Sequence, residues 1–400
     1  MSLGSPASGS DTSSPWKSAD GAKPKPIAVC HIASGDLWAG AERQIATLLK
    51  HLARLETLRI VAIVLNPGRL VAEIEAAGIE VKVIPEKECS FLQILGKSVR
   101  FLRGREIRVM HSHRYKENLL AALLAWRCGA PFVVRTQHGM PEPFEGIKRI
   151  KAALIRHLDR CVASTATHRV ISVSHDMREH LTKIFPSERI ISIHNGIDLQ
   201  EVDSRLGPRD AKAALGIPEN VCVIGTVGRL EPIKRLDIFL MAARHIVAQL
   251  SRVRCLIVGE GSDEGRLREM VHHAGLQDKV LFLGHRNDVY DVMRALDVFV
   301  LCSDHEGLPM SLLEAQYLGA TVVARSVGGI KEVVQHGRTG LLLETSDPRE
   351  LAEACLSVLR NESWRRRLAS HGSAFVAENF SATQTADSVA RLYVSLRLQP

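Results

Sequence analysis

From residue 26 onward, short apolar segments alternate with longer amphipathic segments of helical period. The short segments are rich in Val, Ile and Leu and predict buried parallel strands, and the segments between them predict the covering helices. In the first half of the chain the predicted strands are 27–32, 60–65, 81–84, 108–111, 132–136, 170–173 and 190–193. In the second half they are 221–227, 254–258, 280–283, 298–301, 321–325 and 340–343. This pattern predicts an α/β protein with two parallel sheets in series.

The domain organisation follows from the polar stretch 198–218, which contains helix breakers and separates the two series of strands. At 400 residues the chain also exceeds the usual size of a single core. We predict a disordered tail over 1–25, a Rossmann-like domain over 26–200, a second Rossmann-like domain over 201–375, and a C-terminal helix over 376–400 that crosses back to the first domain. The linker is predicted to carry one short helix.

Composition and charge narrow the class of protein. Hydrophobic residues make up 46% and charged residues 24%, which are ordinary globular values. The net charge of +8 is concentrated in the first half, because residues 1–200 carry +9 and residues 201–400 carry −1. Such an asymmetry predicts that the first domain meets something anionic, such as a lipid surface, a phosphorylated carrier or an acidic glycan. No zinc-like or aromatic-interleaved basic motif supports nucleic-acid binding.

Compartment is indicated by the cysteines and by the N-terminus. The eight cysteines form no Cys-x-x-Cys pair, and several lie inside apolar segments, which is typical of reduced, buried thiols. The Ser-, Gly- and Pro-rich start has no apolar core of signal-peptide type, and no stretch of about 20 apolar residues predicts a membrane span. We therefore expect a cytoplasmic protein.

The most informative segment is 303–315, which follows the predicted strand 298–301. It places Glu306 in a strand-to-helix turn and Glu314 inside the helix that begins near Pro309, so both can face the carboxyl edge of the sheet, where α/β folds bind ligands. Free N–H groups at the start of that helix suit an anion. Spacing alone leaves open that Glu306 is a solvated loop carboxylate and Glu314 a partner in a helix ion pair.

The segment resembles the signature of the retaining family 4 glycosyltransferases of GT-B fold, in which two glutamates are separated by seven residues in an E-G-x-x-x-x-x-x-E-A setting. Further segments match the same family: Val227-Gly228-Arg229-Leu230 followed by Lys234, Gly328-Gly329 with Glu332, His194-Asn195-Gly196-Ile197-Asp198, and Ala39-Gly40-Ala41-Glu42-Arg43. The resemblance covers residue 27 to the C-terminus. It implies two Rossmann-like domains that face an interdomain cleft, the first on the acceptor side and the second binding the donor.

The resemblance implies a role for each matched residue. Arg229 and Lys234 would neutralise the diphosphate of a nucleotide sugar without a metal, since guanidinium and ammonium groups both suit phosphate oxygens. Glu314 would accept hydrogen bonds from the ribose hydroxyls, and Glu306 would orient the donor sugar and stabilise charge at its anomeric carbon. The donor would also contact the backbone of Gly307, Leu308, Pro309 and Met310. As isolated residues, Arg229 and Lys234 could equally be surface cations.

Candidates in the first domain are a glycine and three histidines. Gly40 would allow a phosphate close to a helix start, although many relatives have two glycines where this chain has Ala39-Gly40. His138, at the end of the strand 132–136, matches a family histidine near the reacting carbon of the sugar, whereas a lone histidine there is usually structural. His111 and His113 would share one face of a strand, as in a metal site, but no third ligand is apparent, so no metal is predicted.

A basic amphipathic segment, from Ile147 to Val162, has apolar residues on one helical face with Lys and Arg around it. Relatives that work on lipid-linked glycans often dock on anionic membranes through such a helix, which would make the protein peripheral on the inner face of the plasma membrane. The alternative interpretation of the pattern is a core helix with a solvated basic flank.

The resemblance implies retaining transfer to a glycan or lipid-linked acceptor, as in envelope or exopolysaccharide assembly. UDP-sugars are the favoured donors and GDP-sugars come next; no cofactor is expected. The acceptor hydroxyl would enter on the face that the diphosphate leaves, because no well-placed nucleophile is evident. A nicotinamide oxidoreductase is disfavoured because no Gly-x-Gly-x-x-Gly turn is present. A sugar-nucleotide epimerase and a non-catalytic nucleotide-sugar-binding protein remain alternatives.

Overall fold

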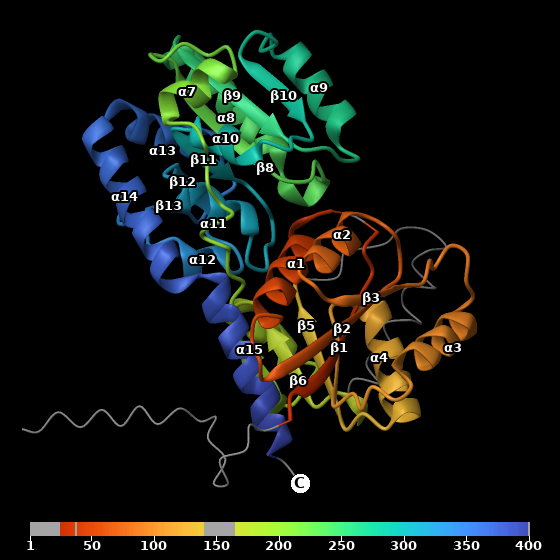
Figure 1. Cartoon of the computed structure of the whole chain (residues 1–400). Coiled ribbons are helices and arrows are strands. Elements are labelled where there is room, and N and C mark those ends of the chain that lie inside the picture. Colours follow the sequence, from red (N-terminus) through yellow and green to blue (C-terminus); the bar gives the residue numbers. More distant parts are fainter. Residues whose placement is uncertain (1–24, 37, 140–164, 399–400) are drawn as a thin grey trace, which may run out of the picture.

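The computed structural model describes residues 25–36, 38–139 and 165–398, which form two domains, one above the other in Figure 1. The N-terminal domain contains a seven-stranded sheet in the order β3-β2-β1-β4-β5-β6-β7, and every pairing in it is parallel. Its strands are β1 (Ile27–Ala33), β2 (Leu58–Val64), β3 (Glu80–Val83), β4 (Val109–Ser112), β5 (Phe132–Gln137), β6 (Arg169–Ser172) and β7 (Ile190–Ser192). All seven strands predicted for this half are confirmed.

The C-terminal domain repeats this architecture with a six-stranded parallel sheet in the order β10-β9-β8-β11-β12-β13. Its strands are β8 (Cys222–Val227), β9 (Val253–Val258), β10 (Val280–Gly284), β11 (Val298–Leu301), β12 (Thr321–Arg325) and β13 (Gly340–Leu343). The six predicted strands are confirmed as well. β11 is buried on both faces, which explains why its sequence is apolar throughout and does not alternate.

Helices lie between the strands. In the N-terminal domain they are α1 (Gly40–Leu52), α2 (Arg69–Ala76), α3 (Phe91–Leu102), α4 (Tyr115–Cys128) and α6 (His175–Leu181). The linker carries α7 (Pro208–Ala214), the short helix predicted there. The rest are α8 (Leu236–Gln249), α9 (Glu264–His273), α10 (Val289–Arg294), α11 (Met310–Tyr317), α12 (Ile330–Val333), α13 (Pro348–Arg360), α14 (Glu362–Asn379) and α15 (Ala382–Arg397). Short 3-10 helices span Ser187–Arg189 and Pro232–Lys234.

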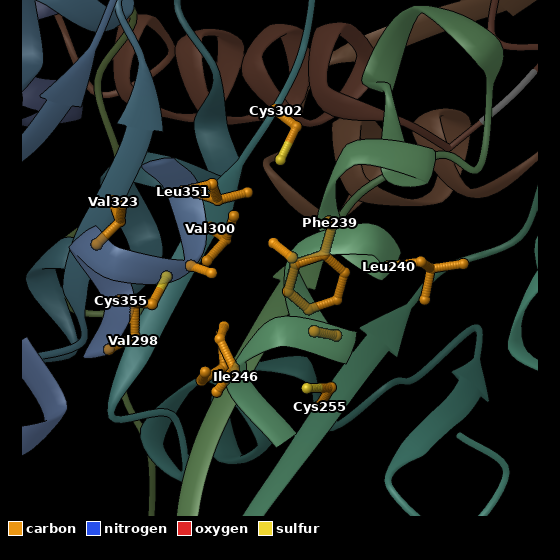
Figure 2. Close-up of a cluster of buried hydrophobic side chains, with 14 of the residues drawn as sticks. Phe239, Leu240, Ile246, Cys255, Val298, Val300, Cys302, Val323, Leu351 and Cys355 are labelled. Atoms are coloured by element: carbon orange, nitrogen blue, oxygen red, sulfur yellow. The ribbon is translucent and has the colours of Figure 1, made fainter. Parts of the chain in front are cut away.

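One buried cluster of the C-terminal domain is formed where α8 and α13 pack on one face of its sheet, and a second includes residues of α10, α11 and α14. Figure 2 shows Phe239 and Ile246 of α8 in the first cluster together with Val300 of β11. Burying side chains of this size contributes about 1.5–3 kcal/mol each. Cys255, Cys302 and Cys355 lie in the same cluster, and burial raises the pKa of each thiol. The described cysteines are all free, which agrees with the sequence-based prediction.

The C-terminal helix α15 leaves the second domain and packs beside α1 of the first (Figure 1). Its start is fixed by a capping box between Ser381 and Gln384. The residue before the linker also bonds to this region: the Ile197 N–H donates to the Phe380 carbonyl at 2.9 Å. Tyr393 of α15 is then fully buried in the core of the N-terminal domain. The expected boundary at residue 375/376 falls inside α14, which continues to Asn379.

Two predicted segments, the tail over 1–25 except for Lys25 and the basic amphipathic segment from Ile147 to Val162, lie outside the described residues. Among the helices of the described part, each is too short or too polar to cross a lipid bilayer.

Candidate active site

Lys234 and Glu306 form the centre of the site, close to the ends of β8 and β11. The Lys234 ammonium donates to Oε1 of Glu306 at 2.6 Å, and the Ser303 hydroxyl donates to the same oxygen at 2.6 Å. The two loops are tied together because the Asp304 N–H donates to the Ile233 carbonyl at 2.9 Å. The structure therefore joins the cation and the carboxylate that lie 72 positions apart in the sequence.

Arg229, directly after β8, lines a small pocket together with Lys234. The pocket is lined by Thr226, Val227, Gly228, Arg229, Leu230, Lys234, Leu236 and Leu301. Two of these side chains are cationic, and the others are apolar or small. The arrangement therefore offers positive charge at the carboxyl edge of the sheet, where an anionic ligand is favoured.

The first turn of α11 adds backbone donors beside Glu306. The N–H groups of Gly307, Leu308 and Met310 make no hydrogen bond within the described part of the chain. Met310 is the first residue of α11, at the positive end of the helix dipole, and Gly307 and Leu308 directly precede its N-cap. Unpaired N–H groups at such a helix start suit a phosphate. Pro309, which was predicted among the donor contacts, is the N-cap residue and has no N–H, so it supplies no hydrogen-bond donor.

Two glycines allow the Glu306 loop to approach its neighbours. A Cβ on Gly307 would lie 2.2 Å from the carbonyl oxygen of His138, which belongs to the other domain. Gly328 has a φ of +53°, and a Cβ there would lie 1.9 Å from the carbonyl oxygen of Glu306. Side chains at either position would push the loop away. The loop is thus packed between the end of β5 in one domain and the turn after β12 in the other.

Glu314 lies in α11 with its side chain 1% exposed, and it forms an ion pair across the domains with Arg43 of α1 at 2.6 Å. Arg43 also donates to the Tyr290 hydroxyl at 2.6 Å. Burial raises the pKa of Glu314, and the guanidinium of Arg43 opposes that shift. The sequence indicated Glu314 but not this partner, because nothing in the local spacing shows which side chain of the other domain reaches it.

Comparisons with known proteins agree with this geometry. A model described as Glycosyltransferase Family 4 matches residues 38–201, and one described as Glycosyl transferases group 1 matches residues 209–375. The D-inositol 3-phosphate glycosyltransferase of Thermobispora bispora is 30% identical over 363 residues, which cover 83% of this chain and 81% of the relative. This chain belongs to the family 4 glycosyltransferases.

Two further comparisons fit that assignment. The Escherichia coli UDP-Gal:alpha-D-GlcNAc-diphosphoundecaprenol alpha-1,3-galactosyltransferase is 28% identical over 303 residues, covering 74% of this glycosyltransferase and 78% of the relative. The crystal structure of Anabaena HepE in complex with UDP-glucose superposes with a TM-score of 0.79 at 21% identity, covering 92% of this chain and all of that one. The two parallel-sheet domains of this glycosyltransferase therefore have the GT-B fold predicted from the sequence.

His138 of this glycosyltransferase lies at the end of β5, where its Nε2 is 3.1 Å from Nδ1 of His113. Burial lowers the pKa of His138 to about 3, so the ring is neutral at physiological pH. His111 and His113 are fully buried beside it, and the structure adds a third histidine, His31 of β1, that the sequence did not indicate. These last three have ring nitrogens within 4.8 Å of one another, the spacing of a possible metal site.

Glu332, predicted in the donor-side turn, makes contacts across the domains. Its Oε1 accepts from the backbone N–H of His175 at 2.7 Å, and its Oε2 is 2.7 Å from Nε2 of His194. Burial raises the pKa of Glu332, but the hydrogen bonds from His194 and from the start of α6 outweigh burial, and the net shift is downward. With His175 and His194, this carboxylate forms a second group whose ligand atoms are close enough to hold a metal ion.

Gly40 begins α1 and lies opposite the first turn of α11. A Cβ on Gly40 would meet only Met310, at 4.0 Å. Packing within the protein therefore does not require a glycine at this position, and the predicted reason for it, the close approach of a ligand, stays a prediction.

Proposed function

We propose that this glycosyltransferase moves a sugar from a nucleotide diphosphate to a glycan or lipid-linked acceptor with retention of anomeric configuration. The observation that carries the proposal is the Lys234–Glu306 contact of 2.6 Å. It lies beside Arg229 and beside the N–H groups of Gly307 and Met310, which have no hydrogen-bond partner among the described residues. Cations and backbone donors converge here on the space that a diphosphate would fill, and an acidic side chain lies at its edge.

In the proposed reaction Lys234 and Arg229 stabilise the negative charge that develops on the departing diphosphate. Fixed cations in a partly buried pocket can take the part that a divalent ion plays in other transferases, so we propose that the reaction needs no metal. Transfer that persists in excess EDTA supports this proposal, and loss of activity restored by Mg²⁺ or Mn²⁺ contradicts it.

Retention is proposed from the bonds that Glu306 makes. Its Oε1 is engaged by Lys234 and by Ser303, which favours a role in orienting the sugar and stabilising positive charge over one as a covalent nucleophile. The acceptor oxygen then bonds to the anomeric carbon as the bond to the diphosphate breaks on the same face. The acceptor proton passes to the leaving phosphate oxygen.

The ribose is proposed to bind Glu314. Arg43 occupies this carboxylate in the ligand-free protein, so the ribose hydroxyls must either share it with the guanidinium or displace it. UDP-sugars are the first donors to test and GDP-sugars the next, because HepE has been crystallised with UDP-glucose.

The first test combines a thermal-shift panel of nucleotide sugars with a transfer assay. A nucleotide sugar that binds the native state raises the unfolding temperature. With that donor, Lys234→Ala should lower turnover about a hundredfold, since it removes a charged donor from the diphosphate. The matched control is Lys279→Ala, which removes a lysine of the same domain whose ammonium donates to the Ser251 carbonyl at 2.7 Å. Near-parental turnover of Lys234→Ala would remove the cation from the mechanism.

Donor-only incubation distinguishes the nearest alternative. A sugar-nucleotide epimerase converts its donor without an acceptor, whereas a transferase gives a new glycoside only when the acceptor is present. A protein that binds the nucleotide sugar and gives neither product would be a non-catalytic binder.

We also propose that the acceptor is lipid-linked and that the protein works at the inner face of the plasma membrane in envelope glycan assembly. The E. coli relative is named for a diphosphoundecaprenol acceptor. The helices α3 and α4, at the outer edge of the N-terminal domain in Figure 1, expose an apolar surface that includes Leu92 and Trp126 at 76% and 82% exposure. Residues 91–128 contain eight basic and two acidic residues, which complements an anionic lipid surface.

Flotation with vesicles tests the membrane proposal. The parent protein should float with phosphatidylglycerol vesicles at low salt, and the double variant Leu92→Glu with Trp126→Glu should lose at least about tenfold in vesicle affinity, because it places two charges at the apolar surface. Met241→Glu, at a 41% exposed position of α8, is the control and should float as the parent does. Binding that is indifferent to lipid charge, or to the double substitution, contradicts the proposal.

A further inference from the structure

Behind His138, five buried side chains form one continuous hydrogen-bonded chain. The first link, from Nε2 of His138 to Nδ1 of His113, measures 3.1 Å, and Nε2 of His113 is 3.0 Å from Nδ1 of His31. Nε2 of His31 is 3.1 Å from the Tyr393 hydroxyl, which is 2.5 Å from Nδ1 of His111. The chain ends where Nε2 of His111 meets the Thr136 hydroxyl at 2.8 Å. It connects β1, β4, β5 and α15.

The four histidines of this chain are neutral. Burial lowers the pKa of His31 and of His138 to about 3, and it lowers the pKa of His111 and of His113 well below the usual range. A neutral imidazole has one N–H and one bare nitrogen, so each ring can donate on only one side. The Tyr393 hydroxyl could accept from both neighbouring rings, but its own proton would then be unpaired in a fully buried site. When Tyr393 donates to one of the two rings, only two directions remain, and all members point the same way.

The end groups decide between the two directions. If His111 donated to Thr136, the Thr136 hydroxyl proton would have no acceptor among the described residues of the protein. If Thr136 donates to His111, each hydroxyl and ring N–H from Thr136 to His113 is used in turn. The final proton then lies on Nδ1 of His138, a buried atom with no hydrogen-bond partner among the described residues. The first direction leaves two buried groups unpaired, the Thr136 proton and the bare Nδ1 of His138, whereas the second leaves only the N–H on Nδ1 of His138. Unpaired buried polar groups are costly, which favours the second direction and a ligand that accepts from that N–H.

We propose that Thr136, His111, Tyr393, His31 and His113 act as positioning residues that fix the ring and the tautomer of His138, so that its Nδ1 presents an N–H donor to the bound donor sugar. The part that concerns the sugar rests on the proposed function. The part that concerns the tautomer does not, and it can be measured in the ligand-free protein.

A metal ion is the competing use of the same side chains. It would have to replace the His31–His113 bond and at least one of the two bonds of His111. It would also bring two positive charges into a fully buried site in which the members of the chain supply no carboxylate. The intact chain of bonds therefore favours the hydrogen-bonded arrangement.

Nitrogen NMR of protein labelled with [15N]histidine tests the tautomer, because protonated and bare imidazole nitrogens resonate far apart. The spectrum of His138→Gln identifies the signals of His138. In the parent, His138 should be protonated on Nδ1 alone. In Tyr393→Phe, which removes one hydroxyl and keeps the ring, the signals of His31, His113 and His138 should become those of mixed tautomers. Thr136→Val removes the first donor of the hydrogen-bonded chain and should give mixed-tautomer signals for all four histidines.

The controls separate loss of the chain from loss of packing. Thr136→Ser keeps the hydroxyl and should retain the parental tautomer, and Tyr317→Phe removes a phenol outside the chain. With an active donor, Tyr393→Phe should lower kcat about tenfold, the size of one lost hydrogen bond, and leave the Kd of UDP within about twofold because UDP lacks the sugar that is transferred.

Two results would overturn the proposal. One is a His138 tautomer that is unchanged in both Tyr393→Phe and Thr136→Val. The other is stoichiometric zinc in the purified parent that His31→Gln removes, since this would make the histidines metal ligands. If no nucleotide sugar is used at all, the proposed function fails, while the NMR result still decides whether the chain sets the tautomer.

Discussion

Glu314 shows how a single residue of the site depends on a partner from the other domain. Its carboxylate is 1% exposed, and the guanidinium of Arg43 at 2.6 Å keeps it compatible with burial. The sequence predicts Glu314 as a donor-site residue, since its spacing from Glu306 follows the family pattern. It did not identify Arg43 as the partner, because a long side chain that reaches across two domains leaves no periodic trace in the sequence.

Replacing Arg43 should expose this dependence. Arg43→Met leaves a buried carboxylate without its cation and should lower the free energy of unfolding by about 3 kcal/mol at pH 7.5. The pKa of Glu314, already raised by burial, would rise further. A raised carboxyl pKa stabilises the fold at low pH and costs stability as pH increases, so the difference from the parent should shrink by pH 4.5.

Urea unfolding at both pH values measures this effect. Arg43→Met combined with Glu314→Gln is the control and should recover most of the loss, because it removes the unpaired charge. If Arg43→Met is as stable as the parent at pH 7.5, the Arg43–Glu314 pair does not contribute to the free energy of unfolding.

The neighbouring strands β1, β4 and β5 determine where the histidines of the N-terminal domain meet. β1 pairs with β4 in a register that places His31 opposite His111. Each strand was predicted from its apolar pattern, and His111 and His113 were recognised as a pair. His31 was not, because the pattern of one strand does not reveal which strand lies next to it in the sheet. Tyr393 of α15 was not recognised either, because the sequence does not reveal which side chains that helix packs against.

These histidines predict how stability depends on pH. Their pKa values are lowered by burial in the folded state, so the unfolded chain takes up protons as the pH falls below about 6.5, whereas the folded protein does not until far lower pH. The free energy of unfolding should therefore decrease from pH 6 to pH 5, by up to about 1.4 kcal/mol per pH unit for each histidine.

Denaturant titrations of two variants isolate this effect from that of the carboxylates. His31→Gln should reduce the slope by the contribution of one histidine, and His371→Gln, at an exposed position, should leave it unchanged. A slope for His31→Gln equal to that of the parent would mean that His31 takes up protons in the folded state too.

At the scale of the whole molecule, α15 joins the two domains. The sequence analysis predicted a C-terminal helix over 376–400 that crosses back to the first domain, and α15 does so. It could not predict the relative orientation of the domains, on which the contacts of Glu332 with His175 and His194 depend. Those contacts arise from tertiary packing and have no local sequence signal.

Truncating one buried side chain of α15 tests its structural role. Leu396 is fully buried in the core of the N-terminal domain, whereas Leu398, two positions on, is 79% exposed. Leu396→Ala should therefore lower the free energy of unfolding by about 3 kcal/mol, and Leu398→Ala should change it by less than about 0.5 kcal/mol. Equal effects in guanidinium unfolding would contradict the packing of α15 on the first domain.

The most direct test of the proposed site is a crystal structure with the nucleotide sugar that stabilises the protein most in the thermal-shift panel. We expect diphosphate oxygens within hydrogen-bonding distance of Lys234 and Arg229, ribose hydroxyls at Glu314, and the sugar between Glu306 and Nδ1 of His138. A nucleotide sugar bound away from these side chains, or a diphosphate held by a divalent ion in their place, would contradict this expectation.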